Sequence, residues 1–386
     1  MHHSTSAFVA FILIVIGIYV SIHAYVYHRM CTALELGRIS NLIVGIFFII
    51  MVFSPFIIRI SERGGPYILS VFFSYTGYTW MGIMAVLVLS LFFFDILHLI
   101  LIKFAHHLNF YERLPPHIDK YTFLISSTIS LIVSVIGFFE AHNIRETKIN
   151  LASRYLPKEH SPLKIVQISD VHISQTLGGN FIADIVARVK KLNPDIVVIT
   201  GDITDIDPRK NKKIINELSA LNPPLGKYAI TGNHEFYAGI DMATEFYKIC
   251  GFRLLRGEYI KITDGIVIMG VDDENGKRFD NYSNVTEERL IEQIPSDSFL
   301  ILLKHQPSVL EQLKGRIDLQ LSGHTHGGQI FPFSLIVKTV YKYFSGLYRI
   351  SDRMSLYVSR GTGYWGPPIR FLAPPEITLF EIENSD

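Results

Sequence analysis

The distribution of apolar and polar positions divides the chain into two parts. Residues 1–140 carry only 13 of the 71 Lys, Arg, Asp and Glu side chains, and long apolar runs fill the space between these charges. A run of roughly 20 apolar residues is long enough to cross a bilayer as a helix. The sequence therefore predicts a transmembrane helical region over 1–141, a polar connector over 142–162 and a globular domain over 163–386.

Four stretches of the first part are predicted to span a membrane. They are residues 6–27, 41–58, 81–102 and 121–139. Residues 67–80 are rich in aromatic and hydroxyl side chains and are predicted to form a separate interfacial or re-entrant piece, which leaves five spans as the alternative to four.

The side of the membrane on which the globular domain lies is only weakly indicated. Five basic residues flank the four spans on each side, so the positive-inside rule favours neither orientation of this multi-pass protein. The only two cysteines, Cys31 and Cys250, are far apart and are expected to be unpaired thiols. Because a disulfide framework and a convincing export signal are both missing from the sequence, we expect the domain on the cytoplasmic side.

Asp95 and His98 lie three residues apart, on one face of the third predicted span. A carboxylate within the hydrocarbon region is a candidate functional group. One acid and one histidine form no recognisable ion pathway, however, so a polar contact between helices is the favoured interpretation.

From residue 163 onward, short apolar runs alternate with segments of helical spacing. The runs typical of strands are 164–169, 195–200, 227–231, 265–271, 299–304, 318–321, 355–359 and 377–381, and the helical segments are 181–192, 210–221 and 241–250. This alternation predicts an α/β fold with helices flanking sheets.

Polar side chains gather directly after five of these predicted strands, at the edge where α/β proteins build their sites. They are Asp170, His172, Asp202, Asn233, His234, His305, His324 and His326. Carboxylate, amide and imidazole ligands without cysteine suit Mn, Fe or Zn. Without His234, the set contains seven ligands. Seven ligands exceed the need of one ion, but they fit two ions that share a carboxylate. Two such ions can generate a hydroxide and clamp the oxygens of a displacement at phosphorus.

Taken singly, these residues have ordinary explanations. Asp170 or Asp202 can cap a helix, and His305 can be a core histidine. Together, their blocks resemble those of the calcineurin-like metallophosphoesterases. The sequences 170–172 (DVH), 201–202 (GD), 232–235 (GNHE) and 323–326 (GHTH) are similar to that family's D-x-H, G-D, G-N-H-[DE] and G-H-x-H blocks, and His305 stands where the family has its isolated histidine.

This resemblance extends over about residues 163–383. The continuation after His326 (GGQI) and the late segments around Arg360, Arg370 and Pro374 look like the YkuE/YaeI-like branch, whose members are membrane-associated. The resemblance implies a four-layer α/β/β/α sandwich, preceded here by the helical region, and a metal-dependent phosphoesterase activity with two divalent ions (Mn, Fe or Zn).

The resemblance also implies a role for each residue of the site. One metal takes Asp170, His172 and His326, and the second takes Asn233, His305 and His324. Asp202 bridges the two metals. His234 does not bind metal but approaches the leaving-group oxygen, as a general acid or as a stabiliser of charge.

Other residues near the blocks carry weaker expectations. Gly201, Gly232 and Gly323 each precede a predicted ligand and are expected to let the backbone turn sharply. Arg360 and Arg370 are possible phosphate contacts, with surface salt bridges as the equal alternative.

The substrate is indicated by one apolar segment, residues 331–348, which follows the last histidines and contains two lysines. We expect it to lie at a membrane face and to admit a lipid phosphate or pyrophosphate; a buried loop and helix is the alternative. The expected partners are membrane lipids and a phosphorylated, lipid-linked substrate, and a net charge of +1 gives no reason to expect nucleic acid. A soluble phosphodiester or nucleotide, with the helices as an anchor, remains open. A non-enzymatic membrane scaffold is disfavoured by the complete ligand set.

Overall fold

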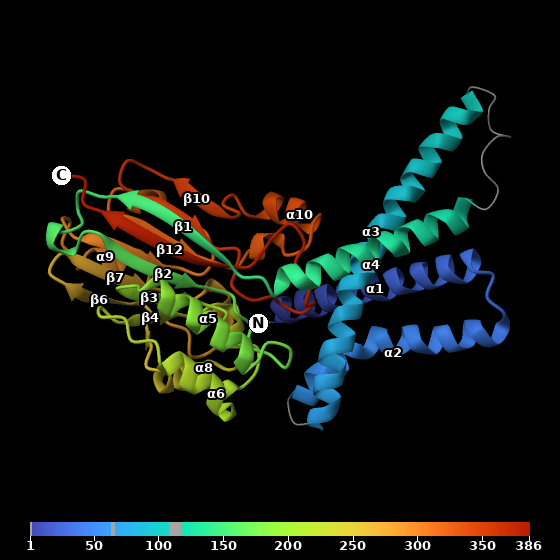
Figure 1. The fold of residues 1–386 in the computed structure, drawn as a ribbon, viewed down its shortest axis with the longest axis horizontal. Helices are drawn as coiled ribbons and strands as arrows, with labels where there is room; N and C mark the ends of the chain where they lie inside the picture. Colours follow the sequence, from blue (N-terminus) through green and yellow to red (C-terminus); the bar gives the residue numbers. More distant parts are fainter. Residues whose placement is uncertain (1, 63–65, 108–117) are drawn as a thin grey trace. The chain divides into compact units, whose positions relative to one another are not determined.

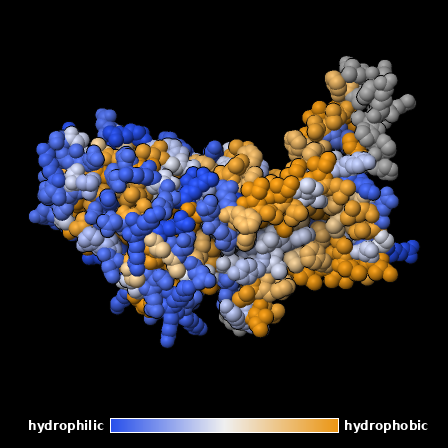
Figure 2. Space-filling model, viewed as in Figure 1, coloured by the Kyte–Doolittle hydropathy of each residue, from blue (hydrophilic) through white to orange (hydrophobic). Residues whose placement is uncertain are grey.

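The computed structural model describes residues 2–62, 66–107 and 118–386. The chain forms two compact units, which divide between Ile136 and Gly137. The first unit is helical, and the second contains all of the β-strands (Figure 1). Figure 2 shows a largely hydrophobic surface over the helices of the first unit and a largely hydrophilic one over the second.

The helices at the start of the chain are α1 (His2–Ala33), α2 (Arg38–Glu62), α3 (Tyr67–His107) and α4 (Ile118–Ala141). In the described part of the chain, these four helices are long and apolar enough to cross a membrane. The separate interfacial piece predicted over 67–80 is wrong, because α3 is one continuous helix of 41 residues. Proline is absent from 67–107, so nothing in this stretch breaks the helix.

Asp95 joins helices of the first unit, as the favoured interpretation of its sequence position predicted. The Tyr25 hydroxyl donates a hydrogen bond to Asp95 Oδ2 at 2.5 Å, and Arg29 lies 3.2 Å from the other carboxylate oxygen. Arg29 also pairs with Asp119 at 3.0 Å. This small network links α1, α3 and α4, with Arg29 paired to both carboxylates.

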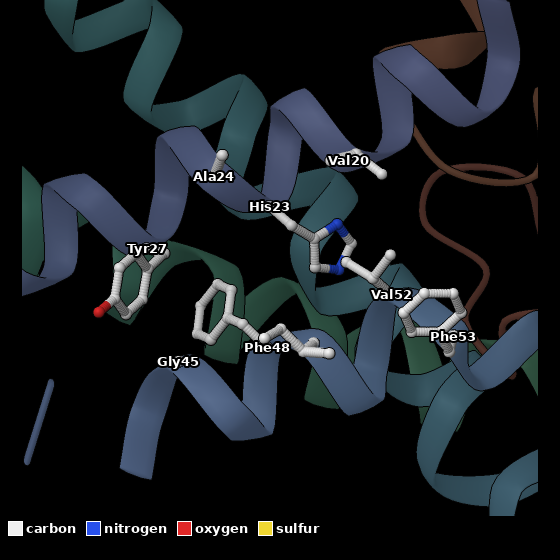
Figure 3. Close-up of a pocket in the computed structure, with 9 residues that line it drawn as sticks. Val20, His23, Ala24, Tyr27, Gly45, Phe48, Val52 and Phe53 are labelled. Atoms are coloured by element: carbon white, nitrogen blue, oxygen red, sulfur yellow. The ribbon is translucent and has the colours of Figure 1, made fainter. Parts of the chain in front are cut away.

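An apolar groove of about 450 Å³ lies between α1 and α2 (Figure 3). His23 borders it, but both ring nitrogens of His23 are engaged, with the Tyr19 carbonyl oxygen and with the Trp80 indole N–H. The remaining lining is almost entirely apolar, in keeping with helices built for hydrocarbon.

The second unit contains two six-stranded sheets. The first has the order β1 (Arg145–Ala152), β12 (Glu376–Glu383), β2 (Leu163–Ile168), β3 (Ile196–Thr200), β4 (Lys227–Ile230) and β5 (Arg253–Leu254). The second has the order β10 (Gly346–Arg349), β11 (Ser355–Val358), β9 (Leu319–Ser322), β8 (Phe299–Leu303), β7 (Ile266–Gly270) and β6 (Glu258–Thr263).

The two sheets pack face to face through residues such as Ile165, Ile268 and Ile301. Helices α5 (Gly179–Leu192), α6 (Lys212–Ser219) and α8 (Ile240–Ile249) cover the outer face of the first sheet. The short helix α9 (Glu287–Ile291) covers part of the outer face of the second. The four-layer α/β/β/α sandwich expected from the sequence is confirmed.

One strand lies within the stretch predicted as a polar connector. β1 pairs in parallel with β12, from Arg145 opposite Glu376 to Ala152 opposite Glu383. It forms an edge of the first sheet, and its side chains alternate between exposed and half-buried. A charged edge strand that buries none of its residues fully has no apolar run, so the sequence pattern did not reveal it.

Candidate metal centre

All eight predicted site residues lie shortly after the carboxyl ends of strands. Asp170 and His172 follow β2, Asp202 follows β3, and Asn233 and His234 open helix α7 (Asn233–Ala238) directly after β4. In the second sheet, His305 follows β8, and His324 and His326 follow β9. Strands β2, β3 and β4 are parallel to one another, as are β8 and β9, so each sheet delivers its residues to a single edge.

The backbone is strained at these positions. Five predicted ligands have a φ in the left-handed region that non-glycine residues rarely adopt. They are Asp170 (51°), His172 (52°), Asp202 (52°), His324 (72°) and His326 (52°). Each such residue costs on the order of 1–3 kcal/mol and persists only where the surroundings impose it, typically at functional sites.

Three clusters of potential metal ligands lie in the described part of the chain, and one of them joins His172 to Asp205 and His234. The other two groups consist of predicted ligands alone. In the first of these two groups, Nε2 of His172 lies 3.0 Å from Nε2 of His326, which lies 3.5 Å from Oδ1 of Asp170. In the second, Nε2 of His305 lies 3.2 Å from Oδ2 of Asp202 and 3.2 Å from Nδ1 of His324.

Asp202 lies between the two groups. Its Oδ2 atom is 3.2 Å from His305 in the second group and 3.8 Å from His172 in the first. One carboxylate oxygen within reach of both groups is the arrangement that a bridging ligand requires.

The side-chain oxygen of Asn233 indicates that a metal ion fits this site. This Oδ1 atom is buried and has no hydrogen-bond partner within the described part of the chain. A buried amide oxygen without a partner costs about 1–3 kcal/mol, so such an atom calls for an explanation. A bound cation would provide the missing partner.

Arg370 holds the ring of His326, a predicted ligand, in place. The arginine is fully buried, and its Nη2 atom lies 3.1 Å from Nδ1 of His326. Because a guanidinium can only donate, Nδ1 accepts in this contact and the proton of the neutral ring lies on Nε2, the atom that faces His172; a metal bound at Nε2 would have to displace that proton. Burial, the neighbouring His172 and the positive charge of Arg370 hold the pKa of His326 well below its usual range, and the neutral ring is the form that binds metal.

The two arginines offered as phosphate contacts are engaged within the protein. The guanidinium of Arg370 donates to the carbonyl oxygens of Gly363 and Ala373, and Arg360 forms an ion pair with the buried Glu376. The salt-bridge alternative therefore describes Arg360, and Arg370 orients a histidine.

Asp205 has a role that the sequence did not reveal. One of its oxygens, Oδ1, accepts from Nδ1 of His172 at 2.8 Å and from Nδ1 of His234 at 2.7 Å. Burial opposes a charge on His234, but Asp202 and Asp205 outweigh it and raise the pKa of His234 to about 9. The only signal in the sequence is that Asp205 shares a loop with Asp202.

Glu235 is the last residue of the GNHE block, and the sequence predicted no role for it. Its carboxylate accepts from three backbone N–H groups, those of Gly232 (2.6 Å), Asp202 (2.9 Å) and Ile203 (2.7 Å). It thereby ties the loop after β3 to the start of α7. Burial and the charge of Asp202 raise the pKa of Glu235 to about 7.

Two of the three glycines serve a different purpose from the sharp turns expected of them. Only Gly201 has a positive φ (90°), whereas Gly232 has a φ of −99°. A Cβ atom at Gly232 would overlap the carboxylate of Asp202, and one at Gly323 would overlap that of Asp170. These two glycines are needed because a neighbouring loop approaches closely.

The segment after the last histidines reaches back to the centre. It contains helix α10 (Phe333–Val340), none of whose residues is buried. Tyr341, which directly follows the helix, places its hydroxyl 2.7 Å from Nε2 of His324. Since Nδ1 of His324 faces His305, Tyr341 holds the outer nitrogen of a predicted ligand.

Comparisons with known proteins agree with this geometry. Residues 163–328 match the family described as calcineurin-like phosphoesterase. A protein of Aquifex aeolicus called an uncharacterized metallophosphoesterase is 34% identical over 258 residues, which cover 66% of this chain and 98% of that protein. The protein of Bacillus subtilis called uncharacterized metallophosphoesterase YkuE is 34% identical over 264 residues, covering 64% of this chain and 89% of that protein.

A third relative, from Danio rerio, is called a transmembrane protein with metallophosphoesterase domain. It is 32% identical over 275 residues, which cover 68% of this chain and 63% of that protein. The resemblance drawn from the sequence blocks is confirmed.

The replacement Gly232→Ala is expected to disrupt the centre. The new methyl group would displace the Asp202 carboxylate, and overpacking of this kind costs about 1–3 kcal/mol. We expect bound metal, measured by elemental analysis of the purified protein, to fall well below that of the parent. Gly315→Ala is the matched control, because a Cβ there meets open space; equal metal content in both variants would contradict the close approach.

The replacement Asp205→Asn is expected to weaken metal binding by about 10–100-fold, the usual cost of losing the partner that orients a ligand. A neutral amide lacks the negative charge of the carboxylate, so its oxygen accepts from the two imidazole N–H groups more weakly. Metal titration of the full-length protein measures the effect. Asp207→Asn serves as the control, since Asp207 binds Arg209 at the surface, and an affinity that drops equally in both variants would count against orientation by Asp205.

Proposed function

This chain belongs to the calcineurin-like metallophosphoesterases and is a metal-dependent phosphoester hydrolase, and we propose that it cleaves a phosphoester or pyrophosphate bond of a lipid-linked substrate. The observation that supports the chemistry most directly is the pair of ligand groups that share Asp202. The lipid-linked substrate is supported by the exposed apolar helix beside that centre.

We assign one divalent ion to Asp170, His172 and His326, a second to Asn233, His305 and His324, and the bridging position to Asp202. Nitrogen and oxygen donors of this kind suit Mn, Fe or Zn. When bound, the two ions would supply a hydroxide near neutral pH and offset the charge of the phosphate. The protein holds the ligands in place through Asp205, Arg370 and Tyr341, so the centre is largely formed before an ion arrives.

His234 is assigned to the leaving-group oxygen. Its backbone N–H donates to Asp202 and its Nδ1 donates to Asp205, which leaves Nε2 to face the substrate. The two carboxylates favour the protonated ring, which can give its proton to the departing oxygen. A general acid of this kind typically accelerates a reaction by ~10²–10⁴-fold.

The lipid-linked substrate is argued from α10. Leu335, Ile336 and Val340 are more than half exposed, and Lys338 lies on the same helix. An exposed apolar helix with basic residues suits the surface of a membrane. The alternative of a buried loop and helix does not fit these exposures. Because Tyr341 follows α10 and contacts His324, a lipid bound along this helix would lie close to the metal centre.

We further infer that the four apolar helices anchor the protein as a multi-pass membrane protein. The name of the Danio rerio relative supports a membrane location. Cys31 and Cys250 are free thiols, which favours the cytoplasmic side for the hydrolase unit. Hydrolysis of a soluble phosphodiester or nucleotide, with the helices as an anchor only, is the second candidate.

Loss of Asp202 is expected to abolish both metal binding and hydrolysis. In detergent-purified protein with added Mn²⁺, Asp202→Ala should lower the turnover of a generic phosphodiester by far more than the about 10–100-fold cost of losing an outer partner of a ligand. Full activity in Asp202→Ala would overturn the assignment.

His234→Asn should lower turnover by ~10²–10⁴-fold while the bound metal is retained. Loss of metal in His234→Asn would place His234 among the ligands.

Polar replacement of the exposed face of α10 is expected to separate two kinds of substrate. The triple variant Leu335→Ser, Ile336→Ser and Val340→Ser should keep the turnover of a soluble ester but lose at least about tenfold on a lipid phosphate in vesicles, since each apolar side chain contributes roughly 1.5–3 kcal/mol when buried. Ile249→Ser, an exposed position on α8, is the control. Unchanged turnover of both substrates would favour the soluble ester, and an equal loss on both would show that α10 acts only on the fold.

A further inference from the structure

Two exposed aromatic side chains lie beside His234 and have no part in the ligand groups. The Trp365 ring centroid is 5.7 Å from that of His234, with the planes at 77°, and Tyr237 lies 5.5 Å away at 61°. Trp365 is 57% exposed and Tyr237 is 42% exposed. Large aromatic rings contribute most when they are covered, so two uncovered rings at the edge of a site indicate a surface made for contact.

The position of Trp365 is fixed by its main chain. The side-chain amide of Gln329 donates to the carbonyl oxygen of Trp365 at 2.9 Å and accepts from its N–H at 3.0 Å. Gln329 lies three residues after His326 and has a φ of 52°. The segment that follows His326 therefore holds Trp365 through both its backbone N–H and its backbone carbonyl group. The indole ring remains exposed.

The position of Tyr237 is fixed by its helix. Tyr237 belongs to α7, which begins with Asn233 and His234 and is capped by the Glu235 carboxylate. Phe279, also partly exposed, extends the aromatic surface from Tyr237, with ring centroids 6.2 Å apart. Both rings beside His234 are thus held by segments that also carry predicted site residues.

We propose that Trp365 and Tyr237 form a subsite for a planar ring, of the nucleobase class, on the leaving-group side of the phosphorus. This rests on the proposed function, because His234 is there assigned to the departing oxygen and the rings flank His234. Stacking of a base on an aromatic side chain contributes about 1–3 kcal/mol, with little dependence on which base it is. The substrate would then carry a nucleoside on the side of His234.

Direct binding can be measured without turnover. Nucleoside monophosphate is titrated into the full-length protein in detergent, and tryptophan fluorescence is compared between the parent and Trp365→Phe, since Trp80 is the only other tryptophan. We expect quenching by the nucleotide that is lost in Trp365→Phe, and none with ribose 5-phosphate. Equal quenching in both proteins would overturn the proposal. So would a Trp365 signal that responds only to vesicles of brominated phosphatidylcholine, because the indole would then be a membrane contact.

Turnover gives the second measurement. For Trp365→Leu, the ratio of kcat/KM for a phosphodiester with a nucleoside leaving group to that for one with an alkyl leaving group should fall about 5–150-fold, the equivalent of 1–3 kcal/mol. The fall should appear mainly in KM, and Trp365→Phe should restore most of the ratio. An unchanged ratio would reject the subsite although hydrolysis persists. If the parent hydrolyses neither ester, the proposed function fails, whereas the fluorescence titration still decides whether the rings bind a base.

Discussion

The structure of the hydrolase unit depends on the burial of two carboxylates, those of Asp170 and Asp202, at the edge shared by two sheets. Both side chains are almost completely removed from water. A buried carboxylate costs several kcal/mol unless hydrogen bonds and positive charge surround it. Here the backbone N–H of His324 donates to Asp170, and that of His234 donates to Asp202, each at 2.8 Å. Asp170 belongs to the first sheet and His324 to the second, so this carboxylate also joins the two halves of the sandwich.

Several features of the surrounding chain follow from this burial. The loops must approach closely enough for main-chain N–H groups to reach the carboxylates, and glycine at 232 and 323 leaves the necessary space. Five of the seven predicted ligands adopt left-handed backbone conformations. Glu235 spans two of these loops with three hydrogen bonds. The imidazoles of the centre are held in turn by Asp205, Arg370 and Tyr341, so the orientation of each ligand is set by a second residue.

The surroundings of the centre differ between the two ligand groups. The second group touches Tyr341 and, through it, the exposed apolar helix α10. The first group shares Asp205 with His234, whose ring contacts Tyr237 and Trp365. A phosphate bound at the metal centre would thus have an aliphatic surface near His324 and an aromatic surface near His234. The chemistry is general for phosphoesters, whereas the choice of substrate is expected to depend on these two surfaces.

The sequence by itself determined the apolar helices, the α/β alternation and the blocks at the strand ends, because each of these is written in residues that are close together in the chain. Hydropathy and period-two runs report local structure, and the blocks lie within a few residues of a strand end. Only the tertiary structure decided what depends on distant partners. β1 was missed because its partner β12 lies more than 200 residues away and its own pattern is polar. The roles of Asp205 and Arg370 likewise depend on histidines that the fold brings close to them. Glycine is needed at 232 and 323 because the fold brings a carboxylate close to each position. Neither kind of neighbour can be identified from residues that are close in the sequence.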